Sequence, residues 1–218
     1  MINYNLKFKW KDGKHHFISD LHYRHDRNFI WGDPKRGYSN VTEMNKDIIY
    51  QWNSQVGHED TVWHLGDTIF GDTDASELLK LYERLNFKTL YCIFGNHTSG
   101  ERTLFKAMMD EMGMEGKEVY PSELKINSEK KVVFLGYYAE IEIDGQQIVL
   151  SHYPHTSWRS QSKGAWNIHG HTHCNLKETD MKRIDIGWDY KNRPLSFKEL
   201  IPIMAKKKRM TGGDYRGK

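Results

Sequence analysis

The sequence is poor in the features that mark secreted and membrane proteins. It has only 2 cysteines among 218 residues, so no disulfide framework is expected and a reducing compartment is indicated. No run of about 18 apolar residues occurs, so no membrane-spanning helix is expected. The first residues, MINYNLKFKWKDGK, lack the apolar core and cleavage site of a secretory signal peptide. We therefore expect a cytoplasmic protein without a membrane contact.

The chain also lacks a strong charge of one sign. Its 32 Lys and Arg residues nearly balance 29 Asp and Glu residues, and the net charge of +3 neither favours nor excludes nucleic acid. The concentrated basic run is KKKR, residues 206–209. With no repeat and no linker, we expect one domain over residues 1–205 and a flexible basic tail over 206–218. A nucleic-acid contact at the tail is the alternative.

Short apolar runs alternate with helical patterns, which is typical of an α/β protein. Strands are expected at HHFIS, TVWHL and TLYCIF, each followed by polar residues. A helix is expected from Asn40 to about Gln55, because Asn40 can cap it and Glu43 can complete a capping box. A second helix is expected after its cap at Asp74. Its inward-facing residues would be Leu78, Leu81, Tyr82 and Leu85.

The second half is richer in strand patterns. Asp144-Gly145 is the preferred two-residue turn of a β-hairpin, and the second strand of that hairpin ends at His152. RIDIG predicts another strand. Ser196 and Glu199 form a capping-box pattern that opens a last helix through about Ala205.

Polar residues of the kinds that bind metals follow the predicted strands. They are Asp20 and His22, Asp67, Asn96 and His97, His152, and His171 and His173. The carboxyl ends of strands in α/β sheets are where ligands bind, so we expect these side chains to meet. Carboxylate, imidazole and amide ligands suit a divalent first-row metal, and the absence of thiolates disfavours a structural zinc site. The set is too large for one ion, which favours two metals that share a carboxylate.

The stretch NIHGHTHC places His169, His171 and His173 at alternate positions. Alternate residues of a strand point to the same face, so an extended conformation would bring the three rings together. Chance clustering is the alternative in a chain with 12 histidines.

Five blocks in order resemble the calcineurin-like metallophosphoesterases, whose pattern is D-x-H, G-D, G-N-H, a single histidine after a strand, and G-H-x-H. Here they are Asp20-Leu21-His22, Gly66-Asp67, Gly95-Asn96-His97, His152 and Gly170-His171-Thr172-His173. The resemblance covers about Phe17 to Leu200. It is closest to a compact bacterial and phage branch, through SDLHYRHDRNFI, EMNKDIIYQWNSQV and DTVWHLGD.

The resemblance implies a fold and a metal centre. The fold would be a four-layer αββα sandwich, with two facing mixed sheets flanked by helices. Asp20, His22 and His173 would bind one divalent ion, and Asn96, His152 and His171 a second. Asp67 would bridge the two ions. Manganese is the first expectation, with iron, nickel, cobalt or zinc as alternatives.

The resemblance also implies the chemistry. Hydroxide between the two ions would attack the phosphorus atom of a phosphate ester, because paired cations lower the pKa of bound water. His97 would lie beside the metals and stabilise the leaving oxygen or donate a proton to it. His169 drops out as a ligand and is expected to be structural.

The sequence departs from the family pattern after the third block. An acidic residue commonly follows G-N-H, but Thr98 stands here and cannot support an imidazolium by charge. The second block, GDTIFGD, lacks the arginine of the protein serine/threonine phosphatases, which ranks that class low. Arg24 and His25 are candidates to contact the substrate phosphate, with a solvated loop and a backbone cap as the alternatives. Asp72 is read as a turn residue, with support of a ligand histidine as the alternative.

Aromatic residues divide into core and loop groups. Trp52, Trp63 and Phe94 fall in periodic apolar segments and are assigned to the core. Tyr153, Trp158 and Trp166 are expected to lie in loops that flank the ligand blocks and to fix those loops, with stacking on a base or lining of a pocket as the alternative. Asp189 is expected to fix a loop rather than to bind metal.

The sequence thus predicts a dinuclear metal-dependent phosphoesterase that favours phosphodiesters, small or nucleotide-like, with monoesters as further substrates. A nuclease acting on RNA or DNA at the same site is the alternative. A non-catalytic binding module is the least favoured, because all seven expected ligands and His97 are present.

Overall fold

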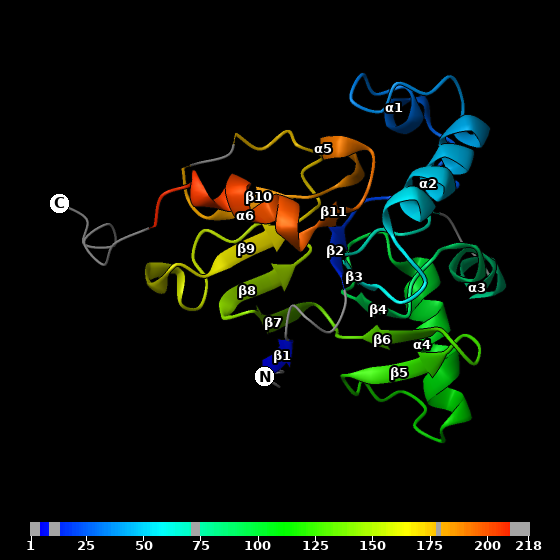
Figure 1. Ribbon diagram of the computed structural model, residues 1–218. Coiled ribbons are helices and arrows are strands. Elements are labelled where there is room, and N and C mark those ends of the chain that lie inside the picture. The colour runs from blue at the N-terminus through cyan, green and yellow to red at the C-terminus, as the bar shows by residue number, and fades with distance from the viewer. Residues whose placement is uncertain (1–4, 9–13, 71–74, 178–179, 210–218) are drawn as a thin grey trace.

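The structure is a computed structural model that describes residues 5–8, 14–70, 75–177 and 180–209. Asp72 and Asp74 lie outside the described residues, so the roles predicted for them stay predictions. The elements in chain order are β1 (Asn5–Phe8), β2 (His15–Ile18), α1 (Asn28–Trp31), α2 (Val41–Gln55), β3 (Thr61–His64), α3 (Ala75–Arg84), β4 (Thr89–Cys92), α4 (Ser99–Glu111), β5 (Ser122–Lys125), β6 (Lys131–Phe134), β7 (Tyr138–Ile143), β8 (Gln146–Ser151), the 3-10 helix η2 (Gln161–Lys163), β9 (Trp166–His169), β10 (Arg183–Asp185), α5 (Trp188–Lys191), β11 (Leu195–Ser196) and α6 (Phe197–Ala205) (Figure 1).

The strands form two mixed sheets. The six-stranded sheet has the order β11-β2-β3-β4-β6-β5, in which β2, β3, β4 and β6 run parallel and the two edge strands run antiparallel. The five-stranded sheet has the order β1-β7-β8-β9-β10. Its β7–β8 hairpin turns at Asp144 (φ 48°) and Gly145 (φ 80°), the left-handed pair that the sequence predicts.

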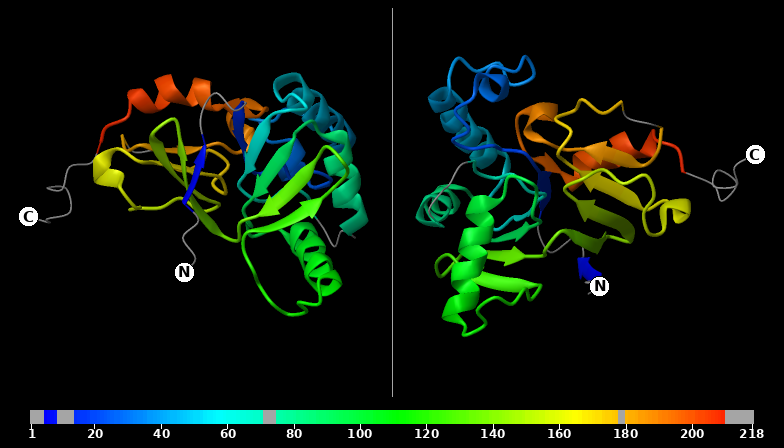
Figure 2. Two further views of the ribbon diagram at one scale, coloured as in Figure 1. Left: turned by 60° about the horizontal axis from the view of Figure 1, so that its bottom comes forward. Right: turned by 180° about the vertical axis from the view of Figure 1, so that it is seen from behind.

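The two sheets pack against each other and carry helices, so the predicted α/β sandwich is confirmed (Figures 1 and 2). Buried side chains from both sheets meet between them: Phe17, Trp63, Ile93, Ile141, Ile148 and Ile168. Helix α6 adds Phe197, Leu200 and Met204 to the same cluster. On the opposite face of β8, Val149 is covered by Trp158 and Ala165 from the following loop.

A second core lies between the six-stranded sheet and helices α2, α3 and α4 (Figure 2). Helix α2 begins after Asn40, whose side chain accepts a hydrogen bond from the Glu43 N–H at 2.9 Å. Glu43 accepts from the N–H of Ser39 rather than from that of Asn40. Met44, Ile48 and Trp52 are fully buried, as are the inward residues predicted for α3. Trp63 and Phe94 are buried as expected.

The described residues that follow α6 contact the domain. Ser196 and Glu199 form the predicted capping box of α6, which ends at Ala205. The next residues are held against the domain: Lys207 Nζ donates to the Arg183 carbonyl at 2.6 Å, and Lys208 N donates to the Asp180 carbonyl at 2.6 Å. Residues 206–209 therefore pack on the segment that leads into β10.

In the part of the chain that the structure describes, no helix has the length and apolar character needed to cross a bilayer. Helix α4 has no counterpart among the predicted elements, although its residues Leu104, Phe105, Met108 and Met109 are buried at helical spacing.

Candidate metal centre

All seven expected ligands come together where strands of both sheets end. Asp20, Asp67 and Asn96 follow the parallel strands β2, β3 and β4. His152 follows β8, and His171 and His173 follow β9. This is the arrangement expected at the carboxyl ends of parallel strands.

Close backbone approach at this edge depends on glycine. A Cβ on Gly170 would lie 2.1 Å from Ser19 Oγ and 2.3 Å from Asp20 Oδ2, and one on Gly95 would lie 2.2 Å from Asp67 Oδ1. Any side chain at either position would displace a carboxylate of the cluster.

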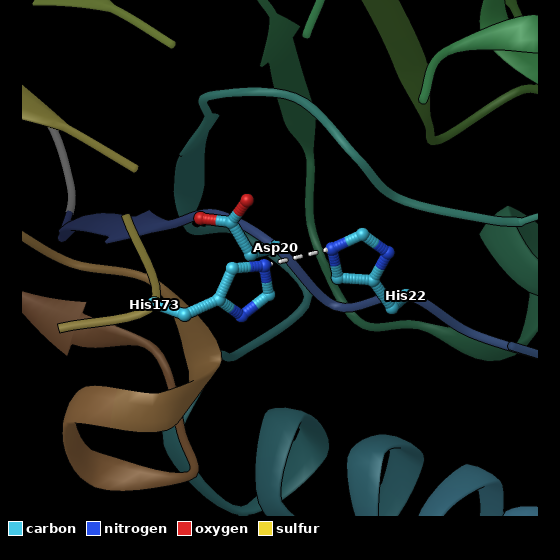
Figure 3. Close-up of side chains that lie close together, drawn as sticks. All are labelled: Asp20, His22 and His173. Atoms are coloured by element: carbon cyan, nitrogen blue, oxygen red, sulfur yellow. Dashed lines mark hydrogen bonds between the residues drawn. The ribbon is translucent and has the colours of Figure 1, made fainter. Parts of the chain in front are cut away.

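The first cluster consists of Asp20, His22 and His173, whose ligand atoms all lie within 4.8 Å of one another (Figure 3). Nε2 of His22 lies 3.2 Å from Nε2 of His173. His173 Nδ1 lies 2.8 Å from the Asp189 carboxylate, which only accepts, so Nδ1 carries the proton and Nε2 presents a lone pair to the cluster. Burial lowers the pKa of His22 well below its ordinary value, which keeps its ring neutral and able to bind a cation.

Asp20 gives the clearest indication that the first cluster suits a cation. Its Oδ2 accepts from the N–H of His171 at 2.9 Å, but its Oδ1 is buried without a hydrogen-bond partner among the described residues. Burial raises the pKa of Asp20 to about 8. A buried carboxylate oxygen without a partner is costly unless a positive charge compensates it, and a divalent ion would do so.

The second cluster consists of Asp67, Asn96, His152 and His171. The Asn96 side-chain oxygen lies 2.8 Å from His152 Nε2 and 2.8 Å from His171 Nδ1. His152 Nδ1 donates to the Leu65 carbonyl at 2.8 Å, so its Nε2 presents a lone pair to the Asn96 oxygen. Two facing lone pairs repel each other, and a cation bound between them would remove this repulsion.

Asp67 lies between the clusters. Its Oδ2 is 3.8 Å from His22 Nε2 in the first cluster and 3.5 Å from His152 Nε2 in the second. Its Oδ1 accepts from the backbone N–H of His97 at 2.7 Å. The residues fit a pair of divalent cations that share one carboxylate, since the donors are imidazole, carboxylate and amide groups.

The strand alternation expected for the three histidines is wrong. Strand β9 ends at His169, and His171 (φ 70°) and His173 (φ 49°) lie in a left-handed turn. The turn, not a pleated strand, directs the two rings to different clusters. His169 is fully buried beside the Gly170 carbonyl, away from the ligand set, in keeping with a structural residue.

Sequence reasoning missed the side chains that hold the ligands in place. Arg36, 4% exposed, donates to both carboxylate oxygens of Asp189 at 3.0 Å and to the Asp20 carbonyl at 2.7 Å. Asp189 thus fixes a loop, as expected, but it also orients His173. Burial alone would raise the pKa of Asp189, yet the hydrogen bonds from His173 and Arg36 hold it well below its ordinary value.

Asp185 at the end of β10 is a second missed residue. It accepts from the N–H of Gly187 at 2.8 Å, from the N–H of Cys174 at 3.1 Å and from the Thr172 hydroxyl. It therefore fixes the turn that carries His171 and His173. Arg36 and Asp185 are ordinary turn and strand residues in the sequence, and the only local signal for Asp189 is its position in GWDY.

The structure places the two residues proposed for substrate contact, Arg24 and His25, in different surroundings. Arg24 pairs with Glu77 of α3, so its guanidinium does not line the cavity beside the metal ligands. His25 is buried, stacks on Phe70 with ring centroids 3.4 Å apart, and lies with its Nδ1 3.3 Å from His22 Nδ1. Burial lowers the pKa of His25 to about 4, so it supports His22 as a neutral ring.

His97 lies beside the first cluster, with its ring centroid 5.6 Å from that of His22. The Thr98 hydroxyl donates to the Gly95 carbonyl at 3.2 Å, so it is engaged with the backbone. Trp158 and Trp166 are buried, which excludes base stacking by either ring, whereas Tyr153 is 51% exposed and its ring lies 4.4 Å from that of His171.

Comparison with known proteins agrees with this geometry. Residues 14–186 match the calcineurin-like phosphoesterase superfamily domain. An uncharacterised protein of Methanocaldococcus jannaschii is 30% identical over 202 residues, covering 89% of this chain and 93% of that protein. The Gene 66 protein of Mycobacterium phage L5 is 28% identical over 203 residues, covering 86% and 92%.

Among solved structures, a protein of unknown function from Aquifex aeolicus has the same fold, with a TM-score of 0.58, 21% identity, and coverage of 88% of this chain and 99% of that one. The match to the superfamily domain spans all five sequence blocks and the strands that precede them. The chain belongs to the calcineurin-like phosphoesterase superfamily.

Proposed function

We propose that this protein is a dinuclear metal-dependent phosphodiesterase. One observation carries the proposal: two clusters of ligand atoms lie on either side of Asp67, and the buried Oδ1 of Asp20 lacks a partner among the described residues. Asp20, His22 and His173 would hold one ion, Asn96, His152 and His171 the other, and Asp67 would contact both. Manganese is the expected metal.

Divalent ions held there would lower the pKa of coordinated water and neutralise charge on the phosphoryl oxygens. The remaining work falls to side chains of this chain. His97 is anchored through its backbone N–H to Asp67 and presents its ring beside the first cluster, where it can donate to the leaving oxygen. Asp189 and Arg36 hold His173 in the tautomer that a metal needs.

The preference for diesters rests on what surrounds the ligands. GDTIFGD lacks the arginine of the protein phosphatase motif, and Arg24 is paired with Glu77. A dianionic monoester therefore finds no arginine clamp at either position. Arg27 supplies a cation on the lining of the neighbouring cavity, which suits the single negative charge of a diester better than the two charges of a monoester.

The alternative of a nuclease draws less support from the tail than the sequence alone suggests. Lys207 and Lys208 contact the Arg183 and Asp180 carbonyls, and Lys208 also pairs with the Asp180 carboxylate. If several phosphates were bound, affinity for an oligonucleotide would fall steeply with salt.

We expect two manganese ions per native chain by metal analysis. The native chain should also turn over bis(p-nitrophenyl) phosphate faster than p-nitrophenyl phosphate or a phosphoserine peptide.

Asp67→Asn tests the shared carboxylate. Asp67→Asn should lose at least about two orders of magnitude in turnover, because the amide removes the negative charge between the two cations. Asp110→Asn, on the exposed face of α4, is the matched control. A fully active protein with one ion, or near-normal turnover by Asp67→Asn, would contradict the proposal.

A further inference from the structure

A cavity of about 360 Å³ opens directly beside the first cluster. Its lining includes His22, His173 and His97. Arg27, Phe29 and Phe70 also line it, and the Phe70 ring lies 5.3 Å from that of His97. The cavity volume lies within the range of small-molecule sites, about 300–1,000 Å³. Because His97 lines this cavity together with His22 and His173, a leaving group that receives a proton from His97 would enter this space.

One aromatic ring on this lining is not explained by packing. Phe29, on the short helix α1, is 70% exposed. Its ring meets His25 edge to face, with centroids 5.6 Å apart, and Phe70 stacks on the same histidine. Phe29 and Phe70 thus flank the buried His25 ring, and Phe29 presents an exposed aromatic face on the cavity lining. A flat ring placed there would bury the exposed face of Phe29.

The cavity also offers polar groups around the aromatic surface. Arg27 supplies a cation, and Asp33 and Asn175 supply a carboxylate and an amide on the lining. Lys35 Nζ donates to the Asn175 side-chain oxygen at 2.7 Å, which fixes that amide. Aromatic faces with hydrogen-bonding groups at their rim match a nucleobase better than a purely apolar ring, because a base carries donors and acceptors on its edge.

We propose that this cavity binds the leaving group of the diester and that this group is a nucleoside, with its base stacked on Phe29. The inference rests on the proposed phosphodiesterase function. In the reaction, water oxygen forms the new bond to phosphorus, the bond from phosphorus to the nucleoside oxygen breaks, and that oxygen takes a proton. No further reactant is needed.

A pair of diesters that differ only in the base isolates its contribution. Thymidine 5′-(methyl phosphate) carries a base on its nucleoside leaving group, and the 5′-(methyl phosphate) of 1,2-dideoxyribose is the same diester without the base. With the manganese-loaded native chain we expect kcat/KM for release of the sugar alcohol about tenfold higher for the thymidine ester, within the range known for stacking of one base on an aromatic side chain. In Phe29→Ala and Phe29→Leu this preference should shrink to within about twofold. Tyr50→Ala, which removes an equally exposed ring (70%) from α2, should keep it.

A binding measurement separates failure of the pocket from failure of the proposed function. Thymidine 5′-monophosphate and 2-deoxyribose 5-phosphate share a sugar phosphate, and only the first has a base. By calorimetry on the manganese-loaded native chain we expect the first to bind about tenfold tighter. Phe29→Leu should bind the two compounds about equally. If the native chain binds both compounds equally, or if Phe29→Leu keeps the preference, the cavity does not bind a base on Phe29, even if diesters are hydrolysed. Loss of all ester hydrolysis with base-dependent binding intact would instead overturn the phosphodiesterase.

Discussion

Five of the seven expected ligands adopt left-handed backbone conformations, with φ between 49° and 70°: Asp20, His22, Asp67, His171 and His173. For residues with a Cβ this region costs about 1–3 kcal/mol each unless the surroundings impose it. Asp and His tolerate it better than β-branched residues do. The backbone at each position is held by bonds such as Asp20 N–H to the Gly66 carbonyl at 3.0 Å. The order of the blocks predicts which residues are ligands, but it does not predict that turns rather than strands orient their side chains.

Asp189 should control the first metal through His173. Asp189→Asn keeps the shape but removes the charge that faces both Arg36 and His173, which leaves a buried guanidinium without a counterion. We expect manganese affinity at one of two sites to fall about 10–100-fold, as is typical when a group supporting a ligand histidine is lost. Metal titration would show one site weakened and one retained. Unchanged affinity at both sites, or equal loss at both, would contradict this role.

His97 should matter most for poor leaving groups. A nitrophenolate leaves readily without a proton, whereas an alkoxide does not, and a general acid typically contributes about 10²–10⁴-fold. We therefore expect His97→Ala to cost far more on a nucleoside or alkyl diester than on bis(p-nitrophenyl) phosphate, with both metals still bound. Equal losses at unchanged metal content would make His97 a hydrogen-bonding stabiliser of the phosphoryl oxygens. The Thr98 hydroxyl, bonded to the Gly95 carbonyl, cannot take over proton donation.

At the scale of elements, the predictions that held are those with a local physical cause. The Asn40 and Ser196 caps, the Asp144-Gly145 turn and the burial of Leu78, Leu81 and Tyr82 each follow from a few neighbouring residues. Short elements such as α5, which is four residues long, have too few turns to show the hydrophobic periodicity from which a helix is predicted. Arg36 gives no signal at all, because its partners Leu21 and Asp189 are 15 and 153 residues away along the chain.

The segment that follows α6 should contribute to stability rather than to catalysis. Truncation after Ala205 removes the bonds from Lys207 to the Arg183 carbonyl and from Lys208 to the Asp180 carbonyl. At about 1 kcal/mol for each hydrogen bond, we expect about 2 kcal/mol less stability in urea unfolding. Turnover of small diesters per folded molecule should not change, because the segment carries no ligand. Truncation after Arg209 keeps these contacts and is the matched control; equal stability of the two chains would show that the contacts contribute nothing.

At the scale of the whole molecule, the metal centre lies where two separately packed cores meet. The core under α2, α3 and α4 fixes the ends of β2, β3 and β4, and the core between the sheets fixes β8 and β9 relative to them. The ligand set is therefore complete only when both cores are formed. The sequence predicts this convergence, since each block follows an apolar strand, but it does not predict the cavity, whose aromatic wall comes from α1 and the loop at Phe70.

Acid should weaken the fold through His64, which is fully buried at the end of β3 and accepts from the Gly66 N–H at 3.2 Å. Burial lowers the pKa of His64 from 6.5 to about 3, so the folded chain keeps this ring neutral while the unfolded chain protonates it below pH 6.5. The unfolded state then binds more protons, and stability falls as pH falls, by about 1.4 kcal/mol per pH unit.

Other buried groups titrate in the same range. Burial raises the pKa of Asp20 to about 8 and that of Glu101 to about 7, and both shifts act in the opposite direction on stability. The difference between the native chain and His64→Asn isolates the histidine, because the amide oxygen can accept the Gly66 N–H but does not titrate. Stability is measured by urea unfolding of metal-free protein between pH 6.5 and 4.5. Relative to His64→Asn, the native chain should lose about 1.4 kcal/mol of unfolding free energy per pH unit as the pH falls. Any greater stability of the native chain at neutral pH should therefore shrink and then reverse. Parallel pH profiles for the two proteins would mean that the folded chain accommodates a protonated His64, and that its burial at the end of β3 does not constrain the pH range of the fold.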